Sequence, residues 1–167
     1  ERFDLLYPSY GDTYPLYNGA IGMTYEQGGI RAGLTVITND GDTLTLKDRI
    51  DHHFSTSMAT IETAANYSDK LISEFKKYFE KNVSNPPGNY KTYVVKAQNI
   101  DRLQKMATLL NKNNITFTFG GDKTLNGYNF ETQKLESFKV ERNDLVLNLQ
   151  QPSAVLASVL FEPQTKV

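Results

Sequence analysis

The sequence predicts an α/β protein in which two strands and a long helix are followed by a small α+β module. Three observations lead to this prediction. Residues 20–25 and 32–38 have the composition of strands, apolar residues recur at spacings of three and four from Leu46 to Phe79, and residues 85–89 contain two consecutive prolines. We therefore expect one domain over residues 1–84, a linker at 85–89 and a second unit over 90–167.

Composition narrows the class of protein and of partner. The chain has 167 residues, 39% of them hydrophobic and 22% charged, as is typical of a globular protein with a core. A net charge of −1 argues against nucleic acid as a partner, since that role needs a basic face. No apolar run approaches the roughly 20 residues of a membrane span, so no membrane partner is expected. Cysteine is absent, which excludes disulfides and thiolate metal sites within these residues.

An aromatic and proline-rich segment opens the chain. Residues 7–19, which we call the tyrosine loop, contain two prolines and the pair Gly11-Asp12. Proline presets φ and glycine permits tight turns, so a loop of fixed, irregular shape is expected. The small and apolar residues 20–25 then predict a strand buried on both faces. Glu26 follows where this run ends.

Glu26 has two interpretations. It is the first solvated residue after the strand, or it is a general base. A carboxylate at the mouth of a cleft, beside apolar and aromatic walls, is partly desolvated, which suits it to proton transfer near neutral pH. The local pattern does not decide between the two.

The run Tyr10-Gly11-Asp12, followed by residues 19–27, resembles the last catalytic segment of zinc carboxypeptidases of the carboxypeptidase A type, particularly large bacterial members. The resemblance extends over roughly residues 3–80. It implies that Glu26 activates a zinc-bound water and that a tyrosine of the loop contacts the terminal carboxylate of a peptide substrate. Tyr10 is the first candidate for that contact and Tyr14 the second. The resemblance also implies a secreted or periplasmic location.

The zinc ligands of that family are a His-x-x-Glu pair and a later histidine, all upstream of the tyrosine loop, whereas this sequence starts just before the loop. Its two histidines, His52 and His53, are neighbours on a predicted helix, where their side chains diverge by about 100° and cannot share one ion. We therefore expect zinc in a full-length parent, no metal ligand in this chain, and a fragment without activity of its own.

The remaining elements of the first domain follow from local signals. The strand over residues 32–38 ends at a turn over 39–42, and Thr45 with Asp48 forms a predicted capping box that starts a helix. Asn66 and Ser68 are expected to interrupt this helix. Its apolar stripe is expected to face a core. The stripe comprises Leu46, Ile50, Phe54, Met58, Ile61, Ala65, Ile72, Phe75 and Phe79.

The second half reads as a small α+β unit with no nucleophile–base pair. A helix is expected to start at Asn99 or Asp101 and to end at Asn113-Asn114. Turns are expected at Gly120-Gly121 and Asn126-Gly127. Strands are expected over residues 90–97, 115–119, 135–140 and 145–149, with a short helix opening at 151–153 and closing at Pro163.

Two further functions compete with the peptidase. One is a non-catalytic module that binds peptide or glycan through the aromatic loop. The other is a glycosidase that pairs Glu26 with Asp12, which requires a defined separation of the two carboxyl groups. An unpaired apolar edge on the strand over residues 20–25 would also favour a homodimer.

Overall fold

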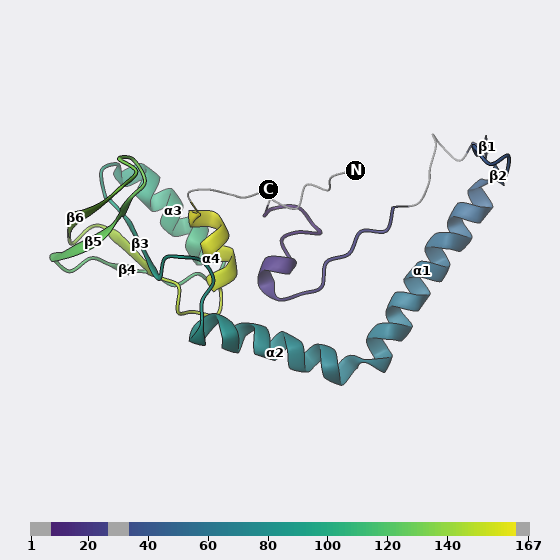
Figure 1. The fold of residues 1–167 in the computed structure, drawn as a ribbon, viewed down its shortest axis with the longest axis horizontal. Coiled ribbons are helices and arrows are strands. Elements are labelled where there is room, and N and C mark those ends of the chain that lie inside the picture. Colours follow the sequence, from purple (N-terminus) through teal and green to yellow (C-terminus); the bar gives the residue numbers. More distant parts are fainter. Residues whose placement is uncertain (1–7, 27–33, 163–167) are drawn as a thin grey trace. The chain divides into compact units, whose positions relative to one another are not determined.

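The computed structural model describes residues 8–26 and 34–162 and combines helices with small antiparallel sheets, in agreement with the general α/β class (Figure 1). It divides into two compact units. The small unit is Ile21–Phe75, and the large unit joins Glu1–Ala20 to Lys76–Val167. Within the ranges that the structure describes, no helix is long and apolar enough to cross a membrane.

The small unit contains a short hairpin. Strand β1 (Val36–Ile37) pairs antiparallel with β2 (Thr43–Leu44). The turn between them is closed by a hydrogen bond from Thr38 N to Asp42 O of 2.8 Å, and Gly41 takes a φ of +88°. The strand expected over residues 32–38 is thus regular over two residues only, while residues 27–33 lie outside the described ranges.

Two consecutive helices follow the hairpin. Helix α1 (Leu46–Asn66) begins with the predicted capping box, in which Asp48 N donates to Thr45 Oγ1 and Thr45 N donates to Asp48 Oδ2. Helix α2 (Ser68–Ser84) follows after a break at Tyr67. The predicted helix, with an interruption between Asn66 and Ser68, is confirmed.

The apolar stripe of α1 does not face a core among the described residues. Ile50, Phe54 and Ile61 are 57%, 66% and 62% exposed. The buried residue of α1 is instead Arg49, whose guanidinium donates to Leu34 O at 2.7 Å. The expectation of a covered stripe is therefore wrong for the described chain, because the two predicted strands do not form a sheet beneath it.

The large unit is built on a three-stranded sheet. Strand β7 (Leu145–Asn148) is central, with β3 (Thr92–Val95) on one side and β4 (Thr118–Phe119) on the other, both antiparallel to it. Strands β5 (Lys123–Asn129) and β6 (Lys134–Val140) form a separate antiparallel hairpin.

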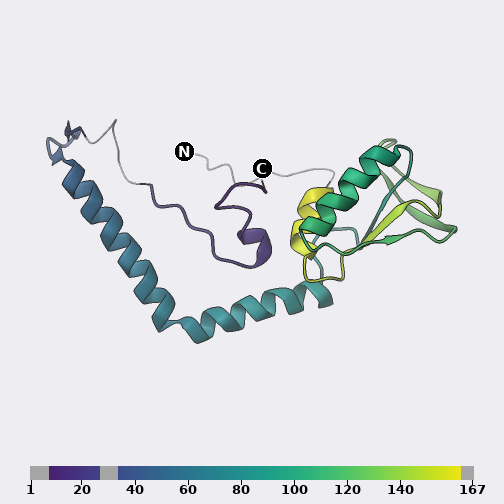
Figure 2. The same ribbon diagram turned by 180° about the vertical axis from the view of Figure 1, so that it is seen from behind.

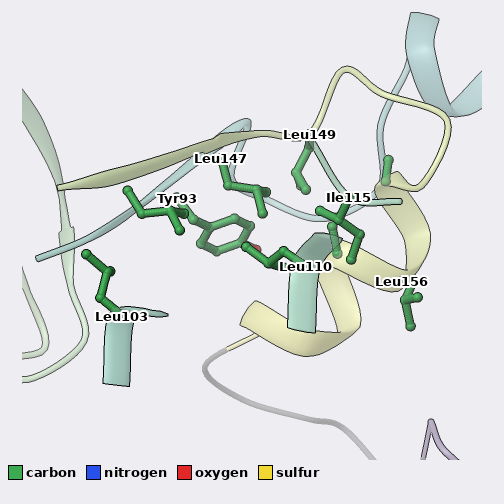
Figure 3. Packing of buried hydrophobic residues seen from close by; sticks show 10 residues of the cluster. Tyr93, Leu103, Leu110, Ile115, Leu147, Leu149 and Leu156 are labelled. Carbon is green, nitrogen blue, oxygen red and sulfur yellow. The ribbon is translucent and has the colours of Figure 1, made fainter. Parts of the chain in front are cut away.

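Two helices enclose the core of this unit. Helix α3 (Ile100–Lys112) is capped by Asn99, whose side chain accepts from Arg102 N at 3.0 Å. Helix α4 (Ala154–Phe161) starts after Ser153. Their side chains meet those of the sheet in one apolar cluster (Figure 3). Its buried members are Tyr93, Leu103, Leu110, Ile115, Leu145, Leu147, Leu149, Ala154, Leu156 and Ala157.

Three local expectations are corrected. Residues 20–25 form no strand, so the apolar edge from which we expected dimerisation is not present there. The strand expected over residues 115–119 is regular only at β4. Asn126-Gly127 is no turn but lies within β5, where Gly127 faces Glu136 and a Cβ would come within 3.0 Å of Phe138 Cε1. Close approach of a ring, rather than a turn, accounts for that glycine.

The expected linker at residues 85–89 lies inside the large unit, because the end of α2 is attached to it. Asn82 is buried and its amide donates to Pro152 O at 2.8 Å. Tyr78 donates through its hydroxyl to Tyr17 O at 2.9 Å. Helix α2 ends at Ser84, directly before the proline-containing segment, as predicted.

A buried carboxylate ties three parts of the large unit together. The side chain of Asp144 is fully buried and accepts from Lys96 Nζ, from Ala97 N at 2.9 Å and from Glu141 N at 2.8 Å. Burial by itself would raise the pKa of Asp144. The hydrogen bonds from Lys96 and the two backbone N–H groups outweigh burial and hold this pKa below its ordinary value.

We expect Asp144→Asn to lower the free energy of unfolding by about 2 kcal/mol at pH 7, since it removes the charge that Lys96 and two amides are arranged to meet. Because the pKa is depressed, this stabilisation is present above about pH 4 and is lost as the pH falls through the folded-state value. Urea unfolding at pH 7 and pH 3 measures both effects. Asp122→Asn, which breaks an exposed pair with Arg142, should cost less than about 0.5 kcal/mol. Equal losses in the two variants would contradict this role of Asp144.

Candidate active site

The tyrosine loop has a defined backbone. Tyr14 N donates to Tyr10 O at 2.9 Å, and a 3-10 turn, η1 (Leu16–Asn18), follows directly. Gly19 ends this turn with a φ of +83°, a conformation that favours glycine. The irregular loop expected from its prolines and glycines is confirmed over the part that the structure describes.

The two candidate substrate-binding tyrosines differ in their surroundings. Tyr10 and Tyr14 are 47% and 40% exposed, so both rings reach solvent. Tyr14 donates through its hydroxyl to Asn113 Oδ1, at the end of α3, at 2.9 Å. This bond occupies the phenolic proton that a substrate carboxylate would otherwise accept.

Further contacts within the large unit hold the tyrosine loop. Tyr17 packs against the leucine-rich core, and Thr13 is fully buried. The turn η1, purple in Figure 2, lies beside the yellow helix α4. The hydroxyl of Tyr78 donates to the carbonyl of Tyr17. Burial raises the pKa of Tyr78, against a smaller opposite effect of a hydrogen bond with Asn82, so this phenol stays protonated as a donor.

Glu26 lies in the small unit and is exposed. Just before it, the Tyr25 hydroxyl is 2.6 Å from Thr60 Oγ1 on α1. The hydroxyl of Thr60 donates to Thr56 O, so Tyr25 is the donor of that bond. The end of the segment that leads to Glu26 is therefore tied to α1, although Glu26 itself has no apolar walls among the described residues.

The predicted site residues are divided between the two units. Tyr10 and Tyr14 belong to the large unit and Glu26 to the small one. Asp12, the proposed glycosidase partner of Glu26, also lies in the large unit, so the structure gives no pair of carboxyl groups at a defined separation.

No group of three histidine, cysteine or carboxylate side chains that could hold a metal occurs among residues 8–26 and 34–162. His52 and His53 are adjacent and exposed on α1. A catalytic zinc requires three protein ligands, so the described residues do not fit a zinc site.

A hollow of about 450 Å³ lies open along α3. It is lined by Asp101, Gln104, Lys105 and Thr108. These side chains include no nucleophile–base pair, and none of them is a predicted site residue.

Sequence patterns did not identify the residues that anchor the tyrosine loop. The sequence predicts Asn113 only as the end of a helix and gives Tyr78 no role. Tyr17 is one of four tyrosines in residues 7–19. Only the fold shows that these three residues, separated by up to 96 positions, meet around the loop.

Comparison with family models, with curated proteins and with solved structures found no match.

We expect the purified 167-residue chain, incubated with one equivalent of zinc and then dialysed, to retain less than about 0.1 zinc per chain, because adjacent helical histidines cannot converge on one ion. Elemental analysis by mass spectrometry measures this. His52→Ala and His53→Ala should leave the value unchanged. Stoichiometric zinc in the unmodified chain would contradict the conclusion that the described residues do not fit a zinc site.

Proposed function

We propose that this chain is part of a zinc metallocarboxypeptidase that removes C-terminal residues from peptides, with Glu26 as the general base. The zinc ligands and the walls of the cleft then come from residues outside these 167. Tyr10 is the substrate-binding tyrosine of the loop, as the resemblance implies, and its ring is about half exposed.

The proposal is supported first by order along the chain. A tyrosine loop with a fixed backbone is followed by Glu26 and then by a capped helix of 21 residues. The zinc carboxypeptidases that the sequence resembles have the same order of loop, glutamate and long helix. The resemblance rests on residues 10–12 and 19–27.

The exposed stripe of α1 is the single observation on which the proposal depends most. Exposed apolar patches of this extent usually mark a surface that binds another structure. Ile50, Phe54 and Ile61 recur at helical spacing and are all more than half exposed. In the resembled family the helix after the catalytic glutamate packs on the central sheet, and a sheet supplied by the parent protein would cover this stripe.

In the proposed reaction Glu26 accepts a proton from the attacking water and then delivers it to the leaving amine of the peptide. This role requires Glu26 to be enclosed, which the described residues do not provide. The link from Tyr25 to Thr60 would keep the preceding residue against α1 once that helix is docked.

A non-catalytic module that binds peptide or glycan is the second candidate. The exposure of Glu26 favours it, because a carboxylate in bulk water is a poor general base at neutral pH. A His-x-x-Glu pair and a later histidine in the parent sequence would favour the enzyme, and their absence would favour the module.

In the full-length protein we expect Glu26→Gln to lower kcat on an N-terminally blocked peptide substrate with a free C-terminus by about a hundredfold to ten-thousandfold, since the amide cannot accept the proton. The zinc content should stay the same. Glu62→Gln, an exposed position on α1, is the matched control and should leave kcat unchanged. Near-normal turnover of Glu26→Gln would remove this residue from the mechanism.

A further inference from the structure

The second half of the chain holds the tyrosine loop. Among the described residues, the loop is joined to residues 76–162 by packing and by two side-chain hydrogen bonds that span 61 and 99 positions of sequence. Such long-range contacts are not needed to form a turn, because the loop already has its own backbone bonds. They fix where the turn lies.

We propose that residues 76–162 hold the tyrosine loop in position, and that Tyr78 and Asn113 are positioning residues for substrate binding. The substrate part of this inference rests on the proposed peptidase function. The positioning of the loop does not depend on that function, because it concerns contacts within the large unit.

The loop is held at three points. Tyr17 packs against the apolar core, which resists displacement because its leucines Leu110, Leu145 and Leu147 are fully buried. Tyr78 holds the carbonyl of Tyr17 from α2. Asn113 holds the phenol of Tyr14 from the end of α3. Three elements therefore converge on a loop of a dozen residues.

This arrangement divides the work among the tyrosines. Tyr17 is an anchor, Tyr14 is bound through its hydroxyl, and the ring of Tyr10 reaches solvent at the start of the same turn. Because Tyr14 N donates to Tyr10 O, a shift of Tyr14 moves Tyr10 with it. Asn113 and Tyr78 thus act on Tyr10 through the loop backbone, without touching the substrate.

Preorganisation of this kind affects substrate binding more than the chemical step. A loop that is already in place costs no ordering free energy when the substrate binds. Weakening the contacts that hold the loop should therefore raise KM and leave kcat nearly constant, provided that Glu26 and the metal are undisturbed.

The first test is hydrogen exchange of the 167-residue chain, followed by mass spectrometry. Tyr78→Phe removes the hydrogen bond to Tyr17 O together with one to Asn82, and Asn113→Ala removes the bond from Tyr14 together with one to Leu109 O. Both changes should speed exchange of the loop amides, those of Tyr14, Leu16, Asn18 and Gly19, by about threefold to tenfold. The amides of β7 should keep their protection, which shows that the core is intact. Tyr67→Phe and Asn111→Ala, which change the same residue types elsewhere, should have no effect on the loop. Unchanged exchange of the loop in both test variants would contradict the proposal that Tyr78 and Asn113 hold the loop.

The second test uses the full-length protein and a peptide substrate. Tyr78→Phe and Asn113→Ala should raise KM by about threefold to tenfold and change kcat by less than about twofold. A fall in kcat at constant KM would overturn the positioning role. If the unmodified full-length protein cleaves no peptide, the proposed function fails. The exchange experiment still decides whether residues 76–162 hold the loop in position.

Discussion

The packing of Tyr17 against the leucine core of the large unit is the contact on which the candidate site depends most. That core is organised around β7, whose Leu145 and Leu147 are fully buried between β3, β4 and the two helices. An interior of this density fixes the position of whatever is packed against it. A loop at the start of the chain thereby acquires the rigidity of a domain formed mainly by the end of the chain.

This connection changes how the two halves of the sequence relate to each other. From composition, the prolines after residue 85 separate a catalytic segment from an accessory module. In the structure, the tyrosine loop and the end of α2 belong with the second half, and Glu26 belongs with α1.

Local signals predicted the parts of the fold that depend on local chemistry. The capping box at Thr45, the break near Tyr67 and the cap at Asn99 are confirmed because each is a hydrogen-bonding pattern between near neighbours in sequence. Patterns whose outcome depends on distant partners gave wrong predictions. Residues 20–25 have strand composition but form no strand, and Gly127 makes room for a ring of the neighbouring strand rather than for a turn. Within the site, the loop was predicted from its residues, whereas Tyr78 and Asn113 required the fold.

The most direct measurement of the central claim is the nuclear Overhauser effect between the ring protons of Tyr17 and the methyl groups of the leucine core in the 167-residue chain. The packing described here predicts clear cross-peaks to leucine methyls of β7 or α4, together with dispersed amide shifts for residues 14–19. Random-coil shifts for those residues, with no cross-peak from the Tyr17 ring to the core, would contradict it.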